Sequence, residues 1–175
     1  MSPKTPPQPA EEPLHYPDVL LRRILKEVRT IAMVGASANW VRPSNFAMKY
    51  LQGKGYRVIP VNPGQAGKKI LGEMTYATLS DIPGRFDMVD VFRSSDAAGA
   101  IADDAIAIAA EKGIQVVWMQ LGVRNDAAAV RLEKAGLIAI MNHCPKIEYG
   151  RLFGELCWSG VNTGLISSKR RKLAS

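Results

Sequence analysis

Residues 31–44 read Ile-Ala-Met-Val-Gly-Ala-Ser-Ala-Asn-Trp-Val-Arg-Pro-Ser, an apolar strand followed by a turn of small residues and the start of a helix. A strand that ends in glycine lets a ligand approach the backbone closely, and the first amide groups of the next helix favour phosphate. The turn has Gly35 but lacks the second and third glycines of the dinucleotide fingerprint G-x-G-x-x-G. The stretch therefore predicts a nucleotide-like ligand other than ordinary NAD.

Apolar strands alternate with helical patterns along the rest of the chain. Further strands are predicted at 56–61, 87–92, 114–120 and 137–141, and helices from Asp18 and at 45–53, 96–112 and 126–135, whereas residues 64–84 are predicted to be irregular. Strands that are apolar almost throughout are typical of a parallel sheet covered on both faces. We therefore predict an α/β, Rossmann-like, doubly wound fold, with a mostly parallel sheet of five strands or slightly more and helices on both faces.

The length and composition indicate a single domain between two extensions. The chain has 175 residues, of which 47% are hydrophobic and 22% charged, an ordinary globular composition. Residues 1–14 are rich in proline and are predicted to be disordered, residues 15–152 form the domain, and residues 153–175 form a C-terminal extension with a basic tail. No apolar run approaches the roughly 20 residues of a membrane span, and the first residues do not resemble a signal peptide. A cytoplasmic location without membrane contact is the expectation.

The charge and the cysteines limit the possible partners. The net charge of +7 includes the tail residues 169–172, and we expect a solvated tail in preference to a nucleic-acid contact. Cys144 and Cys157 are expected to be reduced, because the chain is long enough to bury its own core. The two cysteines and two histidines have no metal-ligand spacing, so no metal is predicted. A homodimer or an unidentified protein partner remains open.

Five loops are expected to form the ligand site. In open α/β sheets the ligand lies beyond the carboxyl ends of the strands, near the point where the strand order reverses. The candidate ligand-binding residues in these loops are Gly35, Ala36, Ser37, Arg42, Pro43, Ser44, Asn62, Pro63, Phe92, Arg93, Ser94, Gln120, Gly122, Asn142, Cys144 and Lys146. Three of them are cations, which suit a ligand with several phosphates. The alternative for each is an ordinary turn, a helix cap or a solvated charge.

The end of the second strand argues against NAD. NAD-binding domains carry an Asp or Glu there for the ribose hydroxyls, whereas this chain has Asn62, followed by Pro63. An asparagine can hydrogen-bond a ribose or a base but offers no charged acceptor. An NAD(P)-dependent oxidoreductase is therefore the alternative and not the leading hypothesis.

Catalytic candidates are few. His143 and Cys144 are sequence neighbours, and adjacent side chains of an extended segment point to opposite faces. A nucleophilic cysteine needs its base within hydrogen-bond reach, so a Cys144-dependent acyl transferase is a second alternative. We nominate no catalytic residue, and binding without turnover is preferred to an enzyme.

Several motifs resemble those of the small stand-alone CoA-binding proteins, a family similar to the CoA-binding domain of the succinyl-CoA synthetase α subunit. The resemblance covers residues 18–152, and its motifs lie at 34–37, 42–44, 55–63, 89–93, 117–122 and 142–148. The family usually has an aspartate where this chain has Asn142 and an arginine near His143.

The resemblance implies a Rossmann-like domain that binds coenzyme A or an acyl-CoA. It places the first turn and Arg42 near the phosphates, and it places the segments 62–63 and 92–94 around the adenosine or the diphosphate. The synthetase's phosphorylated histidine lies in a domain that this chain does not contain, so the expectation is binding without known turnover. Because coenzyme A carries a thiol, a mixed disulfide with Cys144 is conceivable.

Overall fold

The computed structural model describes residues 14–154. The predictions of a disordered N-terminus and of a basic C-terminal tail concern residues that, Leu14, Phe153 and Gly154 apart, lie outside this described part.

Five parallel strands form the central sheet. They are β1 (Thr30–Val34), β2 (Arg57–Val61), β5 (Met88–Val91), β6 (Val116–Met119) and β7 (Ile138–Ile140), and they pair in the order β2-β1-β5-β6-β7. The order reverses between β1 and β5, which makes the carboxyl ends of these two strands the expected place for a ligand. The predicted five-stranded Rossmann-like fold is confirmed.

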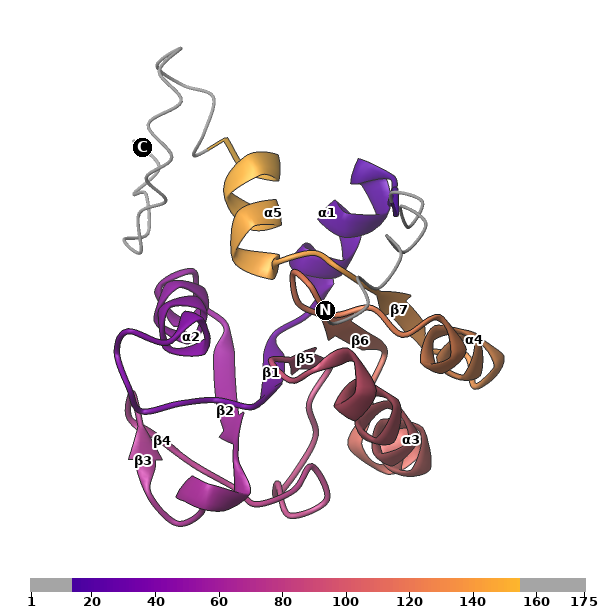
Figure 1. Cartoon of the computed structure of the whole chain (residues 1–175). Helices are drawn as coiled ribbons and strands as arrows, with labels where there is room; N and C mark the ends of the chain where they lie inside the picture. The colour runs from indigo at the N-terminus through magenta and orange to yellow at the C-terminus, as the bar shows by residue number, and fades with distance from the viewer. Residues whose placement is uncertain (1–13, 155–175) are drawn as a thin grey trace, which may run out of the picture.

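Helices cover both faces of the sheet (Figure 1). The helices α1 (Asp18–Glu27), α2 (Pro43–Gly53) and α5 (Pro145–Leu152) lie on one face, and α3 (Ser95–Lys112) and α4 (Asp126–Lys134) lie on the other. Alternate strand residues therefore enter two cores: Met33, Met88 and Trp118 face the first set of helices, and Ala32 and Val89 face the second. Burial on both faces explains why these strands are apolar almost throughout.

Helix α5 was not expected from the sequence. It begins with Pro145 at its first position, which is a common helix start because the missing amide hydrogen needs no partner there. Arg151 fixes the helix to α1: its guanidinium donates to Asp18 at 2.7 Å and to Glu148 at 2.7 Å. The motif at 142–148 was predicted to be a loop, whereas the structure places the N-terminus of a helix in it.

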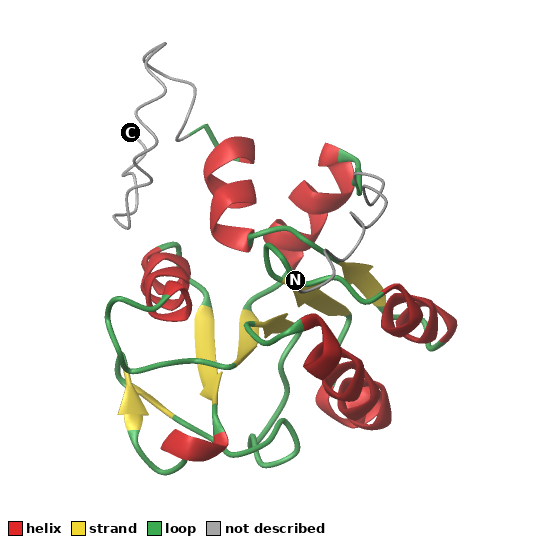
Figure 2. Cartoon of the chain, viewed as in Figure 1, coloured by secondary structure: helices red, strands yellow, loops and turns green. Residues whose placement is uncertain are grey.

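The segment after β2 is more ordered than predicted. A short 3-10 helix (Pro63–Gln65) precedes two antiparallel strands, β3 (Lys69–Ile70) and β4 (Glu73–Met74), at the edge of the molecule (Figure 2). Their two-residue turn places Leu71 at φ +47° and Gly72 at φ +87°. A leucine is unusual at the first position of such a turn, which asparagine, aspartate or glycine normally occupies, so the sequence carried no clear hairpin signal.

Candidate functional site

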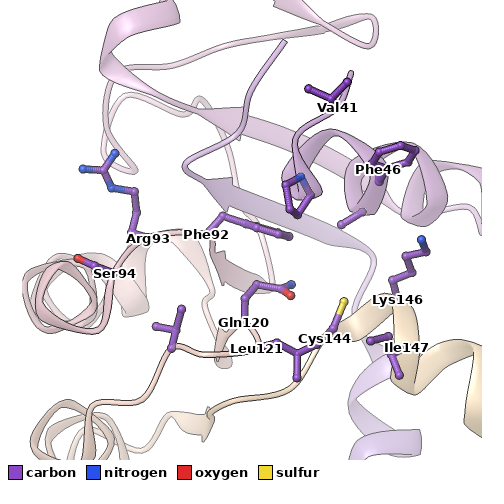
Figure 3. A pocket seen from close by; sticks show the side chains of 13 residues that line it. Val41, Phe46, Phe92, Arg93, Ser94, Gln120, Leu121, Cys144, Lys146 and Ile147 are labelled. Carbon is purple, nitrogen blue, oxygen red and sulfur yellow. The ribbon is translucent and has the colours of Figure 1, made fainter. Parts of the chain in front are cut away.

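Two cavities lie at the carboxyl ends of the strands. The large cavity has a volume of about 930 Å³ and lies between α2, the N-terminus of α5 and the loops after β5 and β6 (Figure 3). It is lined by Val41, Pro43, Phe46, Ala47, Phe92, Arg93, Ser94, Gln120, Leu121, Val123, Cys144, Lys146 and Ile147. The small cavity, of about 330 Å³, is lined by Val34, Gly35, Val61, Asn62, Pro63, Ala77, Thr78, Leu79, Arg93, Ala97, Ala100, Ile101 and Asp104.

Gly35 lets the loop after β1 lie directly against the loop after β5. Its φ is +86°, and a Cβ atom at this position would lie 2.3 Å from the carbonyl oxygen of Phe92. Its amide also donates to the carbonyl of Val61 at 2.9 Å. Glycine is therefore required here by the packing of the chain itself, whatever ligand the small cavity holds.

Asn62 connects the loops after β1 and β2. Its side-chain oxygen accepts a hydrogen bond from the amide of Gly64 at 2.9 Å, and its side-chain nitrogen donates to the carbonyl of Ala36 at 2.8 Å. Both ends of the amide group are thus engaged within the protein. Asn62 shapes the wall of the small cavity in addition to any contact with a ribose or a base.

Four residues of the predicted first turn line neither cavity. Ala36 is fully buried, and Ser44 is buried at the start of α2. The hydroxyl of Ser37 accepts from the amide of Asn39 at 3.1 Å. Arg42 is exposed at the N-cap position of α2 and makes no side-chain capping bond. Ser37 therefore has a local role in the described structure, and Pro43 is the predicted residue of this segment that reaches the large cavity.

Arg93 lines both cavities. It lies between Phe92, which lines the large cavity, and Ser94, whose hydroxyl accepts from the amide of Ala97 at 3.3 Å and caps α3. The positive end of α3 is therefore close in sequence to an exposed guanidinium. Such an arrangement favours an anion at the junction of the two cavities.

The large cavity has a mainly apolar wall that sequence reasoning missed. Val41, Phe46 and Leu121 line it, and their exposed fractions are 54%, 50% and 57%. Ile147 adds to this wall from α5 (Figure 3). The signal was present in the sequence as apolar residues in segments otherwise expected to be solvated, such as Val41 in the first turn and Leu121 after the fourth main strand.

Asp90 and Gln120 form a buried pair next to this cavity. The side-chain nitrogen of Gln120 donates to Oδ1 of Asp90 at 2.8 Å, while Oδ2 of Asp90 is buried and has no hydrogen-bond partner within residues 14–154. Burial raises the pKa of Asp90 to about 7, and the bond from Gln120 opposes this rise. The amide group of Gln120 lies at the cavity wall (Figure 3). Sequence reasoning found no role for Asp90, because one acid inside an apolar strand matches no catalytic pattern.

Cys144 presents its sulfur to the large cavity from the residue before α5 (Figure 3). Burial raises the pKa of this thiol, and the charge of Asp90 raises it further. Backbone hydrogen bonds from Ile147 and Lys146, together with the Lys146 charge, act in the opposite direction. The ammonium of Lys146 lies 5.9 Å from the ring centroid of Phe46. The thiol is therefore mainly protonated at neutral pH.

Gly122, Asn142 and His143, in the loops after β6 and β7, make contacts within the protein. Asn142, at φ +54°, accepts with its side-chain oxygen from the amide of Gly122 at 2.8 Å, which joins the loops after β6 and β7 outside both cavities. The ring of His143 lies 5.0 Å from the Tyr16 ring, and its Nδ1 is 2.8 Å from the carbonyl of Met141. His143 does not line the large cavity, so the structure does not bring it to Cys144 as a base.

Two properties of the described residues bear on other kinds of site. Within residues 14–154, no group of three His, Cys, Asp or Glu side chains could hold a metal ion. No helix in the same range is long and apolar enough to cross a membrane.

A comparison with protein families identifies the family of the chain. A family model described as "CoA binding domain" matches residues 29–150. The Bacillus subtilis (strain 168) protein named "Uncharacterized protein YneT" is 33% identical over 129 residues, which are 74% of this chain and 91% of that protein.

Two solved structures have the same fold at higher identity. Prb, described as "PH1109 protein redesigned for binding", is 38% identical with a TM-score of 0.74, and the match covers 80% of this chain and 94% of that one. A hypothetical protein from Pyrococcus horikoshii OT3 is 35% identical with a TM-score of 0.72, and the match covers 86% of this chain and 99% of that one.

Proposed function

Because this chain belongs to the CoA binding domain family, we propose that it binds coenzyme A or an acyl-CoA across the two cavities, without chemical turnover. The observation that carries the proposal is the position of Arg93, which lines both cavities. Coenzyme A consists of a nucleotide and a pantetheine arm joined by a diphosphate. A guanidinium between two cavities suits that diphosphate, because it can donate two parallel hydrogen bonds to phosphate oxygens.

The nucleotide part is assigned to the small cavity. Its walls include backbone turns and small side chains, such as Gly35, Pro63 and Ala97, which allow the flat adenosine to approach closely. The carboxylate of Asp104 is the acidic group of this wall and can accept from a hydroxyl or an amino group. The N-terminus of α3 adds a favourable potential for phosphate next to Arg93.

The pantetheine arm and any acyl group are assigned to the large cavity. The arm is apolar along much of its length and carries two amides. The walls formed by Phe46, Phe92, Leu121 and Ile147 suit the apolar parts. The amide of Gln120 is fixed by its bond to Asp90 and can pair with an amide of the arm.

The absence of turnover is proposed from the surroundings of Cys144. Its thiol has a raised pKa, and the ring of His143 is engaged with Tyr16 and the carbonyl of Met141. A cysteine that transfers acyl groups with turnover needs the opposite conditions, a lowered pKa and an adjacent base. A cytoplasmic location and a homodimer or another protein partner stay predictions.

Calorimetry with a series of fragments tests the proposal. We expect coenzyme A to bind with a Kd below ~1 mM, and adenosine 3′,5′-bisphosphate and pantetheine each to bind much more weakly, because each fills one cavity. NAD and NADP are the comparison ligands for the oxidoreductase alternative. If NAD(P) binds as tightly as coenzyme A, or if coenzyme A does not bind, the proposal is wrong.

A further inference from the structure

We propose that Cys144 is a thiol–disulfide exchange site, at which the pantetheine sulfur of coenzyme A becomes covalently attached to the protein. This inference rests on the proposed function, because the bound cofactor must bring its sulfur to the large cavity.

The first observation is the position of the cysteine sulfur. Cys144 lines the large cavity, and Figure 3 shows its sulfur directed into the space between Gln120 and Lys146. Arg93 is on the side of the same cavity that also borders the small one. With the diphosphate at Arg93, the arm that ends in the thiol runs along the cavity toward Cys144.

The second observation is independent of the cysteine. Asp90 is fully buried, and its Oδ2 has no hydrogen-bond partner within the described residues. Its Oδ1 accepts from Gln120, a residue of the cavity wall, and its charge acts directly on the Cys144 thiol. An unpartnered buried carboxyl oxygen is costly, and a ligand in the adjacent cavity is one explanation for it. Gln120 therefore links the buried Asp90 carboxyl to the cavity wall that also carries the Cys144 thiol.

The chemistry is an exchange that needs no separate oxidant. The co-reactant is a disulfide of coenzyme A, in which the pantetheine sulfur is bonded to a second thiol compound. Cys144 attacks the pantetheine sulfur, the new bond joins the two sulfurs, and the old disulfide bond breaks. The second thiol compound leaves as a thiolate and takes up the proton that Cys144 loses. Two electrons move from the cysteine to the leaving thiol, so atoms and charge balance.

The surroundings of Cys144 make the exchange selective. Asp90 on β5 opposes formation of the thiolate, whereas Lys146 and the amides at the start of α5 favour it, and Arg93 lies at the cavity wall. Since the thiolate fraction is small at neutral pH, a disulfide that meets the thiol by diffusion reacts slowly. A disulfide held in the cavity reacts faster because binding supplies a high effective concentration.

Intact-mass analysis tests this inference. Reduced protein, freed of reductant, is incubated with the symmetrical disulfide of coenzyme A or with glutathione disulfide, and the modified residue is mapped on peptides. We expect one coenzyme A adduct on Cys144, formed at least about tenfold faster than the glutathione adduct and removed by dithiothreitol. Excess acetyl-CoA, which has no disulfide, should slow the reaction by occupying the cavity. The rate should rise with pH, because the thiol pKa is above its ordinary value.

Matched variants separate the possible failures. Cys144→Ser should form no adduct, and a thermal unfolding curve like that of the wild type shows that it is folded. Cys157→Ser should react like the wild type. The inference is overturned if the adduct maps to Cys157, if glutathione disulfide reacts equally fast, or if a protein that binds coenzyme A forms no adduct. If coenzyme A does not bind at all, the proposed function fails as well.

Discussion

The two cavities differ in what forms them. The small cavity depends on backbone turns whose polar groups are already used within the protein, as the hydrogen bonds of Asn62 and the close approach of Gly35 to Phe92 show. The large cavity is lined mainly by apolar side chains. Gln120 is a polar residue of its wall and is hydrogen-bonded to the buried Asp90. The shape of the small cavity is therefore fixed by the backbone. The ligand preference of the large cavity depends on its side chains and can change when they are substituted. Substitutions should affect the two cavities in different ways.

The largest expected effect concerns the buried carboxyl next to the large cavity. Burial raises the pKa of Asp90 from 3.8 to about 7, so the folded protein holds a proton there that the unfolded chain has lost. Its contribution to stability is present below pH ~4 and is lost as the pH rises through about 7. We expect the free energy of unfolding to fall by an amount on the order of 4 kcal/mol between pH ~4 and pH ~8, and Asp90→Asn to remove this fall. Urea unfolding at several pH values measures it.

Asp104→Asn is the matched control, because this carboxylate is exposed at the wall of the small cavity. It should keep the pH dependence of the wild type. If the wild type, Asp90→Asn and Asp104→Asn have the same pH profile, the Asp90 carboxyl does not have a raised pKa in the folded protein.

The second effect concerns the small cavity. Gly35→Ala places a Cβ 2.3 Å from the carbonyl oxygen of Phe92 at a φ of +86°, so the loops after β1 and β5 must move apart. We expect a loss of about 2–4 kcal/mol in stability and a weakened Kd for adenosine 3′,5′-bisphosphate. Thermal unfolding and calorimetry measure the two quantities.

Gly67→Ala isolates the clash from the backbone strain. Gly67 has nearly the same φ, +82°, but a Cβ there meets nothing within 4 Å. We expect a cost of only about 1 kcal/mol and unchanged binding. Equal losses in the two variants would show that the close approach of the two loops is unimportant.

The fold could be predicted because its strands are buried on both faces. The five strand segments that are apolar almost throughout sufficed for the parallel sheet. Gly113, at φ +79°, ends α3 directly after the helix predicted at 96–112. Helix α5 was missed because its core contacts come from few residues, such as Leu152, and its attachment to α1 depends on Arg151 and Asp18, which are 133 residues apart. Such long-range ion pairs leave no periodic signal.

The candidate site could be predicted only in part. The strand-end rule nominated Arg93, Gln120, Cys144 and Lys146, and the structure places these four at one cavity. The rule could not separate them from Asn142, which faces the loop at Gly122, because both kinds of residue follow a strand. The apolar wall was missed because polar, charged and turn-forming residues are the usual sign of a phosphate site, whereas the apolar parts of a pantetheine arm or an acyl group need apolar contacts.

The third effect concerns the residue shared by the two cavities. We expect Arg93→Ala to weaken the binding of coenzyme A about 10–100-fold, the usual contribution of a charge-assisted hydrogen bond. The pantetheine fragment alone should lose much less, because it has no diphosphate. Arg23→Ala removes an equal charge from the exposed face of α1 and should leave the Kd unchanged. If both variants weaken binding equally, long-range attraction by the net charge explains the effect better than a contact does.

The smallest effect tests the apolar wall. Phe46 is half exposed on α2 and lines the large cavity, so Phe46→Ala should cost the fold little. A ligand that covers the exposed half of this ring would lose roughly 1 kcal/mol, or about fivefold in Kd. We expect that loss for an acyl-CoA with an apolar acyl group and no loss for adenosine 3′,5′-bisphosphate, which is assigned to the small cavity. Val19→Ala, at a side chain 79% exposed on α1, is the control and should change neither Kd. If the bisphosphate is weakened as much as the acyl-CoA, the two cavities do not divide the ligand as proposed.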